Sequence, residues 1–338
     1  MNDIRSFIQA LPKAELHLHL EGTITPATLV ELSLRHDAQP LTLEQAEALY
    51  RFNDFSEFLE AFKVVTRLLS GPDDYELAAW RMLQQLAQQG VVHAEIYISV
   101  GVIYLWRNHD PHCFEPIFAA LERARRRAEN ELGISLYWIF DAVRHFTVEE
   151  AARVFRKAAE LRPQYPSIIG IGLGGDERRT GSEPFRHLYD EAKSAGLRLT
   201  NHAGETTGPE AIWEALAIGS ERLGHVLSAI HDPALLDELR TRAIPLELNP
   251  TSNVRTGVCS SFAEHPLRRY FDAELLVTLN SDDPAFFGSD LANEFYLAHT
   301  EQGFNEDQLR TLASNSIRAS FLPSAAKERW LNQIESLT

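Results

Sequence analysis

Eight short runs of β-branched and other apolar residues recur along the chain, and they constrain the fold more than any other feature of the sequence. Most are separated by stretches with apolar residues every three or four positions, the spacing of an amphipathic helix, such as PEAIWEALAIGS and PALLDELRTRA. Strands that alternate with helices in this way favour an α/β fold, the parallel (β/α)8 or TIM barrel. The predicted strands are 14–20, 90–99, 134–142, 168–177, 197–205, 221–226, 244–253 and 275–284.

An open, doubly wound sheet is the alternative arrangement of such elements. That fold often carries a glycine-rich phosphate loop after its first strand, and no such loop follows residues 14–20. The glycines at 170–175 lead into DERR and not into a helix start. Since no linker, repeat or low-complexity segment divides the chain, residues 1–338 are expected to form one barrel domain.

The connection between the first two predicted strands, residues 23–89, is much longer than an ordinary strand-to-helix unit. It contains FSEFLEAFKVVTRLL, in which Phe55, Phe58, Leu59 and Phe62 fall on one helical face. This face either packs into the core or forms an apolar lid over the mouth of the barrel, where insertions of this kind lie. A helical insertion that acts as a lid is the expectation.

The composition limits the classes of partner. The formal net charge of −16 argues against binding nucleic acid or an anionic membrane. No apolar stretch is long enough to span a membrane and no signal peptide is recognisable, so a cytoplasmic location is expected. The two cysteines, Cys113 and Cys259, are too few for a disulfide framework. The expected partner is a small molecule, and the sequence makes no prediction about oligomeric state.

His17 and His19 lie two residues apart in the first predicted strand, AELHLHL. Residues at this spacing project from the same face of a strand. A single buried histidine is most often a structural residue. Two imidazoles on one face near the carboxyl end of a strand can instead meet one metal ion.

Further polar residues follow later strands at the edge where barrel enzymes carry their active sites. They are His202 and Glu205 in HAGE, His225 in LGH, and Asp282 and Asp283 in NSDDP. Three histidines and an aspartate form a suitable ligand set for Zn²⁺, which lowers the pKa of bound water toward about 7. The residues left over can serve as general acid and base, so metal-assisted hydrolysis is indicated.

The other histidines need no role in this site. His36, His109, His231 and His265 lie in stretches that read as loop or helix, and they are expected to be structural or solvent-exposed.

The chain resembles the adenosine deaminase family, a branch of the metal-dependent amidohydrolases, over nearly its whole length. The resemblance rests on six segments in the same order: PKAELHLHLEG, GLGGDE, NHAGETTGPE, ERLGHV, NPTSNVRTG and LNSDDPAFFG. It implies a hydrolase that removes the 6-amino group of an adenine-bearing purine and releases ammonia. No lysine follows the fourth strand, where relatives with two metals carry one, so one Zn²⁺ per chain is expected, with Fe²⁺ as an alternative.

The family's residue roles transfer to matching positions of this chain. His17, His19, His202 and Asp282 would hold the metal. Glu205 would protonate purine N1. His225 would orient the attacking water and stabilise the oxygen that adds, and Asp283 would hydrogen-bond to N7 and help with the water. Gly175 would offer its backbone N–H to N3. His19 and Glu21 would lie beside the substrate.

Glu21 is a departure that bears on the substrate. Typical adenosine deaminases have an aspartate here that helps to bind the ribose, whereas many adenine deaminases and nucleoside-analogue deaminases of the family have glutamate, a longer acid that could accommodate a ribose altered at its 5′ side. SDDPAFFG also resembles the adenine branch, while LGGDE and TSNVRTG resemble the nucleoside branch. Adenosine or a 5′-modified adenosine, such as 6-aminodeoxyfutalosine, is therefore the first candidate, and free adenine is the alternative.

Two other classes share some of these features. A metal phosphoesterase of the PHP type also begins with HxH on a barrel strand, but it gathers more histidines than this chain offers. A non-catalytic binding protein on the same barrel would not need the complete set of reactive residues found here.

Overall fold

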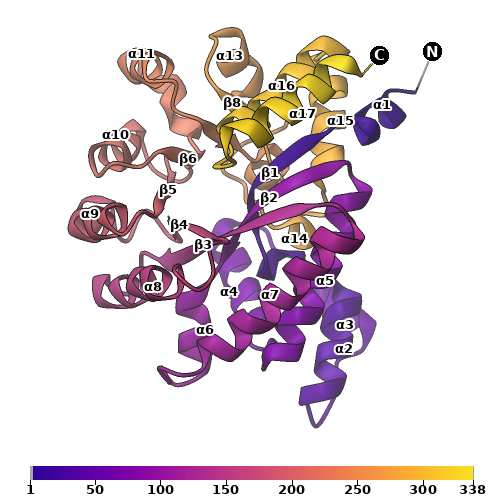
Figure 1. The fold of residues 1–338 in the computed structure, drawn as a ribbon, viewed down its shortest axis with the longest axis vertical. Coiled ribbons are helices and arrows are strands. Elements are labelled where there is room, and N and C mark those ends of the chain that lie inside the picture. The colour runs from indigo at the N-terminus through magenta and orange to yellow at the C-terminus, as the bar shows by residue number, and fades with distance from the viewer. Residues whose placement is uncertain (1–2, 338) are drawn as a thin grey trace.

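Eight parallel strands in chain order, β1 to β8, form a single sheet in the computed structural model, which describes residues 3–337 (Figure 1). Its two ends meet at Leu18 and Asp282, where His19 N–H donates to the Asp282 carbonyl and Asp282 N–H donates to the His17 carbonyl, both at 3.0 Å. The predicted (β/α)8 barrel is thereby confirmed. The strands are β1 Lys13–His19, β2 Val91–Ile98, β3 Ser135–Val143, β4 Ile168–Gly174, β5 Arg198–Ala203, β6 Arg222–His225, β7 Leu246–Leu248 and β8 Val277–Leu279.

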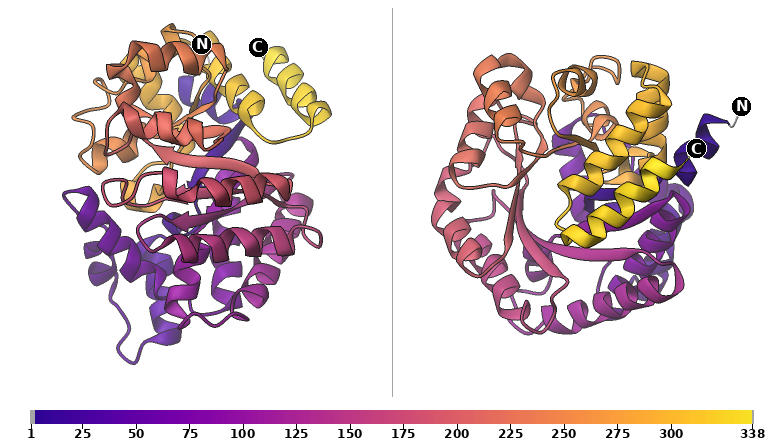
Figure 2. Two further views of the ribbon diagram at one scale, coloured as in Figure 1. Left: turned by 90° about the vertical axis from the view of Figure 1, so that its left-hand side faces the viewer. Right: turned by 45° about the horizontal axis from the view of Figure 1, so that its top comes forward.

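The helices lie around the outside of the strands (Figure 2). The predicted helices PEAIWEALAIGS and PALLDELRTRA correspond to α10 and α11, and each has a proline in its first turn, where no N–H is needed. The helices are α1 Ile4–Ala10, α2 Pro26–His36, α3 Leu43–Ala48, α4 Phe55–Thr66, α5 Pro72–Gln88, α6 Val100–Trp106, α7 Phe114–Glu131, α8 Val148–Leu161, α9 Arg186–Ser194, α10 Pro209–Ala217, α11 Pro233–Thr241, α12 Pro250–Arg255, α13 Leu267–Asp272, α14 Pro284–Phe287, α15 Leu291–Gln302, α16 Glu306–Ala319 and α17 Ser324–Ser336. Three short 3-10 helices are η1 Glu21–Thr23, η2 Glu183–Phe185 and η3 Leu227–His231. Among the described residues, no helix combines the length and apolar character that crossing a bilayer requires.

The last two strands are shorter than the sequence predicts. The runs 244–253 and 275–284 were expected to be extended, but β7 ends at Leu248 and β8 at Leu279. The following prolines explain the difference, because Pro250 and Pro284 lack the N–H that a strand would use and each begins a short helix. Beyond the end of β8, the backbones of Asn280 and Asp282 still bond to neighbouring strands, and Asp282 and Asp283 line the cavity at the mouth of the barrel.

The insertion after β1 contributes to both core and cavity. On α4, Phe58 is buried, and its ring centroid lies 5.5 Å from that of Phe286 and 5.1 Å from that of Phe287 on α14. Phe55, Phe58 and Phe62 also line the main cavity. The core and lid interpretations of this helix face are therefore compatible, and movement of α4 stays a prediction.

Candidate active site

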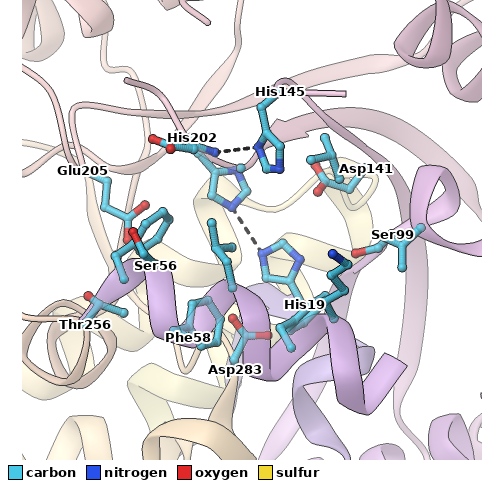
Figure 3. A pocket seen from close by; sticks show the side chains of 18 of the residues that line it. His19, Ser56, Phe58, Ser99, Asp141, His145, His202, Glu205, Thr256 and Asp283 are labelled. Atoms are coloured by element: carbon cyan, nitrogen blue, oxygen red, sulfur yellow. Dashed lines mark hydrogen bonds between the residues drawn. The ribbon is translucent and has the colours of Figure 1, made fainter. Parts of the chain in front are cut away.

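The residues predicted for the site lie at the carboxyl ends of their strands. His17 and His19 belong to β1 and His202 to β5, while Asp282 follows β8. All four side chains are buried. His19 Nε2 faces His202 Nε2 at 3.2 Å, as Figure 3 shows. We call these four residues the ligand cluster.

The ligand cluster has the donor chemistry of a divalent metal site. One potential ligand atom from each of His17, His19 and His202 lies within 4.8 Å of the others. Asp282 Oδ1 lies 3.5 Å from His17 Nε2 and 3.6 Å from His19 Nε2. His17 Nε2 is buried without a hydrogen-bond partner, which is costly unless a cation or donor meets it. The set therefore fits a nitrogen- and oxygen-ligated metal such as Zn²⁺.

Glu247 fixes the orientation of the His17 ring. His17 Nδ1 lies 2.6 Å from Glu247 Oε2, and the Tyr97 hydroxyl donates to the same oxygen at 3.1 Å. Arg222 pairs with the other carboxylate oxygen, and both members of this ion pair are fully buried. An ionised Glu247 accepts the Nδ1 proton, so His17 turns its Nε2 toward the ligand cluster. Glu247 had no motif of its own and was missed by the sequence predictions.

The backbone is unusual at two site positions. Asp282 has φ +63° and His225 has φ +65°, in the left-handed region that non-glycine residues seldom adopt. Such conformations cost on the order of 1–3 kcal/mol each and occur often at functional sites. Two glycines beside the site leave no room for a side chain. A Cβ at Gly224 would lie 2.5 Å from His17 Cε1, and one at Gly22 would lie 2.0 Å from Asp283 Oδ1. Glycine is required there for close approach.

The carboxyl groups beside the ligand cluster differ in charge. Burial, reinforced by the charge of Asp282, raises the pKa of both Glu205 and Asp283 well above their ordinary values. Burial opposes ionisation of Asp282 as well, but the adjacent His17 holds the pKa of Asp282 well below its usual range. Burial therefore favours the protonated, hydrogen-bond-donating form of Glu205 and Asp283, and the ionised form of Asp282 is favoured by its histidine neighbours.

Two further acids lie at the ends of β1 and β3. Burial raises the pKa of Glu21 to about 7, and this side chain accepts the Ser99 N–H at 3.1 Å. Asp141 was missed, although its place at the end of the apolar run ISLYWIFDA was a usable signal. Its Oδ1 is buried without a partner, and burial raises its pKa to about 8. Asp141 and Ser99 lie across the cavity from Glu205 (Figure 3).

His19, His202, Glu205, Asp141, Asp282 and Asp283 line one cavity of about 480 Å³. It runs from Asp282 and Asp283 to residues on α4 and on the loop after β4, where Lys63 and Arg179 line it. Gly175 also lines the cavity and has φ +91°. The volume lies within the range of about 300–1,000 Å³ typical of small-molecule sites.

His225 lies beside the ligand cluster, where one of its ring nitrogens comes within 4.8 Å of ligand atoms of His17 and Asp282. Its Nδ1 lies 3.7 Å from Glu205 Oε1, and its Nε2 lies 4.0 Å from Asp282 Oδ2. Burial lowers the pKa of His225 to about 3, so the ring is neutral. His265, which the sequence did not single out, is buried and connected to His225 through Asn253.

Comparison with known proteins agrees with this geometry. The family model for adenosine deaminase matches residues 12–337. The aminodeoxyfutalosine deaminase of Streptomyces avermitilis is 39% identical over 339 residues, which cover 99% of this chain and 94% of that protein. The structure of an adenine deaminase from Arthrobacter aurescens has a TM-score of 0.90 and 31% identity, covering 96% of this chain and 98% of that one. An amidohydrolase from Burkhoderia ambifaria with bound Zn has a TM-score of 0.89 and 26% identity, covering 98% of this chain and 93% of that one.

Proposed function

We propose, on the premise that the chain belongs to the adenosine deaminase family, that it hydrolyses the 6-amino group of an adenine-bearing nucleoside. As a deaminase, the protein is a metal-dependent hydrolase that acts on adenine-type substrates. Beyond this general activity, we propose a nucleoside substrate, one Zn²⁺ and roles for individual residues. The observation that carries it is one cavity lined both by His19, His202 and Asp282 of the ligand cluster and by two buried carboxyl groups, Glu205 and Asp283, whose pKa values burial raises.

The ligand cluster is proposed to hold one Zn²⁺ through His17, His19, His202 and Asp282. Support comes from the donor set, the unpartnered His17 Nε2 and the zinc in a structural relative. When bound there, the metal supplies a water of lowered pKa, ready for attack at neutral pH.

The chain's own residues would activate the purine ring. Protonated Glu205 donates to purine N1, which draws electrons away from C6 and prepares it for attack. Protonated Asp283 donates to N7 and, with the backbone N–H of Gly175 directed at N3, fixes the plane of the ring. His225 lies beside Glu205 and Asp282, where it can meet the oxygen that adds to C6. The C6–N bond then breaks and ammonia leaves with the first proton that the water has lost. The second proton, released as the C6=O bond forms, returns to Glu205.

The proposed substrate is adenosine or a 5′-modified adenosine such as aminodeoxyfutalosine. The cavity continues from the carboxyl cluster to α4 and Arg179, so a free base alone would leave its outer part unfilled. Asp141 and Ser99, across the cavity from Glu205, supply acceptors or donors for sugar hydroxyls. Glu21, which is buried and accepts the Ser99 N–H, is proposed to act on the same side. The similarity to a protein named for aminodeoxyfutalosine supports the modified nucleoside.

A kinetic panel tests the proposal. Zinc-loaded protein is assayed with adenosine, aminodeoxyfutalosine and adenine, following ammonia release and the ultraviolet change on loss of the 6-amino group. We expect kcat/KM for at least one nucleoside to exceed that for adenine by about tenfold or more, a difference of about 1.4 kcal/mol. A preference for adenine would replace the nucleoside assignment, and no turnover of any of the three would reject the proposal.

The same three substrates, assayed with the variant Glu21→Asp, test whether Glu21 contributes to recognition of the sugar. If Glu21 contacts the sugar, kcat/KM changes for the nucleosides and stays within about twofold for adenine. Equal changes for all three compounds would remove Glu21 from sugar recognition.

A further inference from the structure

A chain of hydrogen bonds behind His225 determines which of its ring nitrogens carries the proton. The chain begins at a backbone group, the N–H of Leu267, which donates to His265 Nδ1 at 3.2 Å. His265 Nε2 lies 3.1 Å from Asn253 Oδ1, and Asn253 Nδ2 lies 3.0 Å from His225 Nδ1.

The direction of every bond follows from the first one. A backbone N–H can only donate, so His265 Nδ1 must accept, and the single proton of a neutral His265 lies on Nε2. That proton points at the Asn253 side chain, which must present its oxygen there. The amide –NH₂ of Asn253 then points at His225, whose Nδ1 accepts. The remaining nitrogen of His225, Nε2, therefore carries the proton.

Burial keeps this chain intact. Asn253 is fully buried, and His225 and His265 are each 2% exposed, so water does not compete for these bonds. Burial also lowers the pKa of His265 to about 3, which keeps its ring neutral. Asn249 Nδ2 approaches the same His225 Nδ1 at 3.3 Å and adds a second donor.

We infer that Asn253 and His265 are positioning residues that hold His225 in its Nε2–H tautomer, so that His225 donates a hydrogen bond during deamination and does not accept a proton. The inference deepens the proposed function and rests on it for the reaction. In the described part of the chain, His225 Nε2 has no hydrogen-bond partner, and this ring lines the cavity. Its proton is thus free to stabilise the oxygen that adds to C6. The proton lost by the attacking water passes to the carboxylate that Glu205 becomes after protonating N1, and from there to the departing ammonia.

The tautomer can be measured directly. Protein labelled with ¹⁵N at histidine and loaded with zinc is examined by NMR, in which protonated and unprotonated ring nitrogens have well-separated shifts. The His225 signals are those lost in His225→Asn. We expect a protonated Nε2 and an unprotonated Nδ1, and the opposite pattern would overturn the inference. This result does not depend on turnover, so it is separable from a failure of the proposed function.

Two pairs of variants test the positioning role. Asn253→Asp replaces the donor by an acceptor and should move the His225 proton to Nδ1, with kcat about tenfold or more lower and KM within about threefold. Asn315→Asp, a change at another buried asparagine, whose Nδ2 donates to the Val277 carbonyl, should leave the tautomer and kcat unchanged.

His265→Leu removes the donor that orients Asn253 and should give a mixture of His225 tautomers and a lower kcat. His265→Gln, whose amide can still donate to Asn253, should recover most of both. Loss of kcat in Asn253→Asp with an unchanged tautomer would show that Asn253 acts through packing alone, and would overturn its positioning role.

Discussion

Glu247 fixes the ring orientation of His17, a residue more than two hundred positions away in the chain. It accepts from His17 Nδ1 and is itself held by Arg222, so the ring it orients presents Nε2 to the ligand cluster. Outer carboxylates of this kind commonly raise the metal affinity of a histidine ligand. Glu247 is thus a part of the proposed metal site although it does not reach the metal position.

Glu247→Gln should weaken zinc binding by about 10- to 100-fold, because an amide holds the imidazole less firmly and does not raise its basicity. Competition with a chromophoric chelator measures the affinity. Glu122→Gln serves as control, since Glu122 is equally buried but bonds to Trp138 and Ser167 away from the ligand cluster. Equal affinities for the two variants and the wild type would exclude this role of Glu247.

Glu205→Gln should lower kcat by about 10²- to 10⁴-fold while zinc content stays near one per chain, because the amide cannot give up a proton to N1. Steady-state kinetics and metal analysis on the same sample provide the two readings. Glu210→Gln, an exposed glutamate on α10, is the matched control. A kcat close to that of the wild type would mean that Glu205 is not the proton donor.

At the scale of elements, helix α15 is docked through a buried carboxyl group. Glu294 accepts from the Ser289 hydroxyl and from the Thr251 N–H, which connects this helix to the start of α12. Burial raises the pKa of Glu294 to about 7. The folded protein therefore binds this proton more tightly than the unfolded chain does, and this group's contribution to stability is lost as the pH rises from about 4.5 to about 7.

Glu294→Gln should remove this pH dependence. Relative to the wild type, the variant should gain on the order of 3 kcal/mol in unfolding free energy at pH 8 and little at pH 4.5. Urea unfolding at the two pH values measures the difference. Glu301→Gln on the exposed face of the same helix should show no such gain. A gain of the same size at both pH values would point to packing, not ionisation.

At the scale of the molecule, the ligand cluster joins the two ends of the sheet. His17 and His19 lie on β1, His202 lies on β5, and Asp282 follows β8 beside the seam that closes the barrel. A metal bound by all four would favour the folded state alone, because the unfolded chain does not bring these residues together.

Removal of metal by a chelator should therefore lower Tm, and added zinc should restore it in a concentration-dependent way. The stabilisation approaches about 4 kcal/mol when free zinc is 1,000 times Kd. Calorimetry at several zinc concentrations measures it. His19→Ala should lose the response, whereas His187→Ala, on the exposed surface of α9, should keep it. A Tm independent of zinc in the wild type would contradict a metal shared by these strands.

The sequence by itself determined the order of the strands and much of the site. Alternation along β1 puts His17 and His19 on one face, and the polar ends of the later strands supply His202, Asp282 and Asp283, because parallel barrel strands all end at the same rim. These signals are local. The predicted ends of β7 and β8 were wrong, since Pro250 and Pro284 were read as parts of strands and instead begin short helices.

Only the tertiary structure decided which residues support those side chains. Glu247, Asn253 and His265 belong to no reactive pattern, and their importance follows from contacts with His17 and His225 on other strands. Such contacts depend on strand register and on closure of the barrel, which bring together residues far apart in the chain. The spacing of residues identified the reactive groups, while packing around them set their protons, tautomers and orientations.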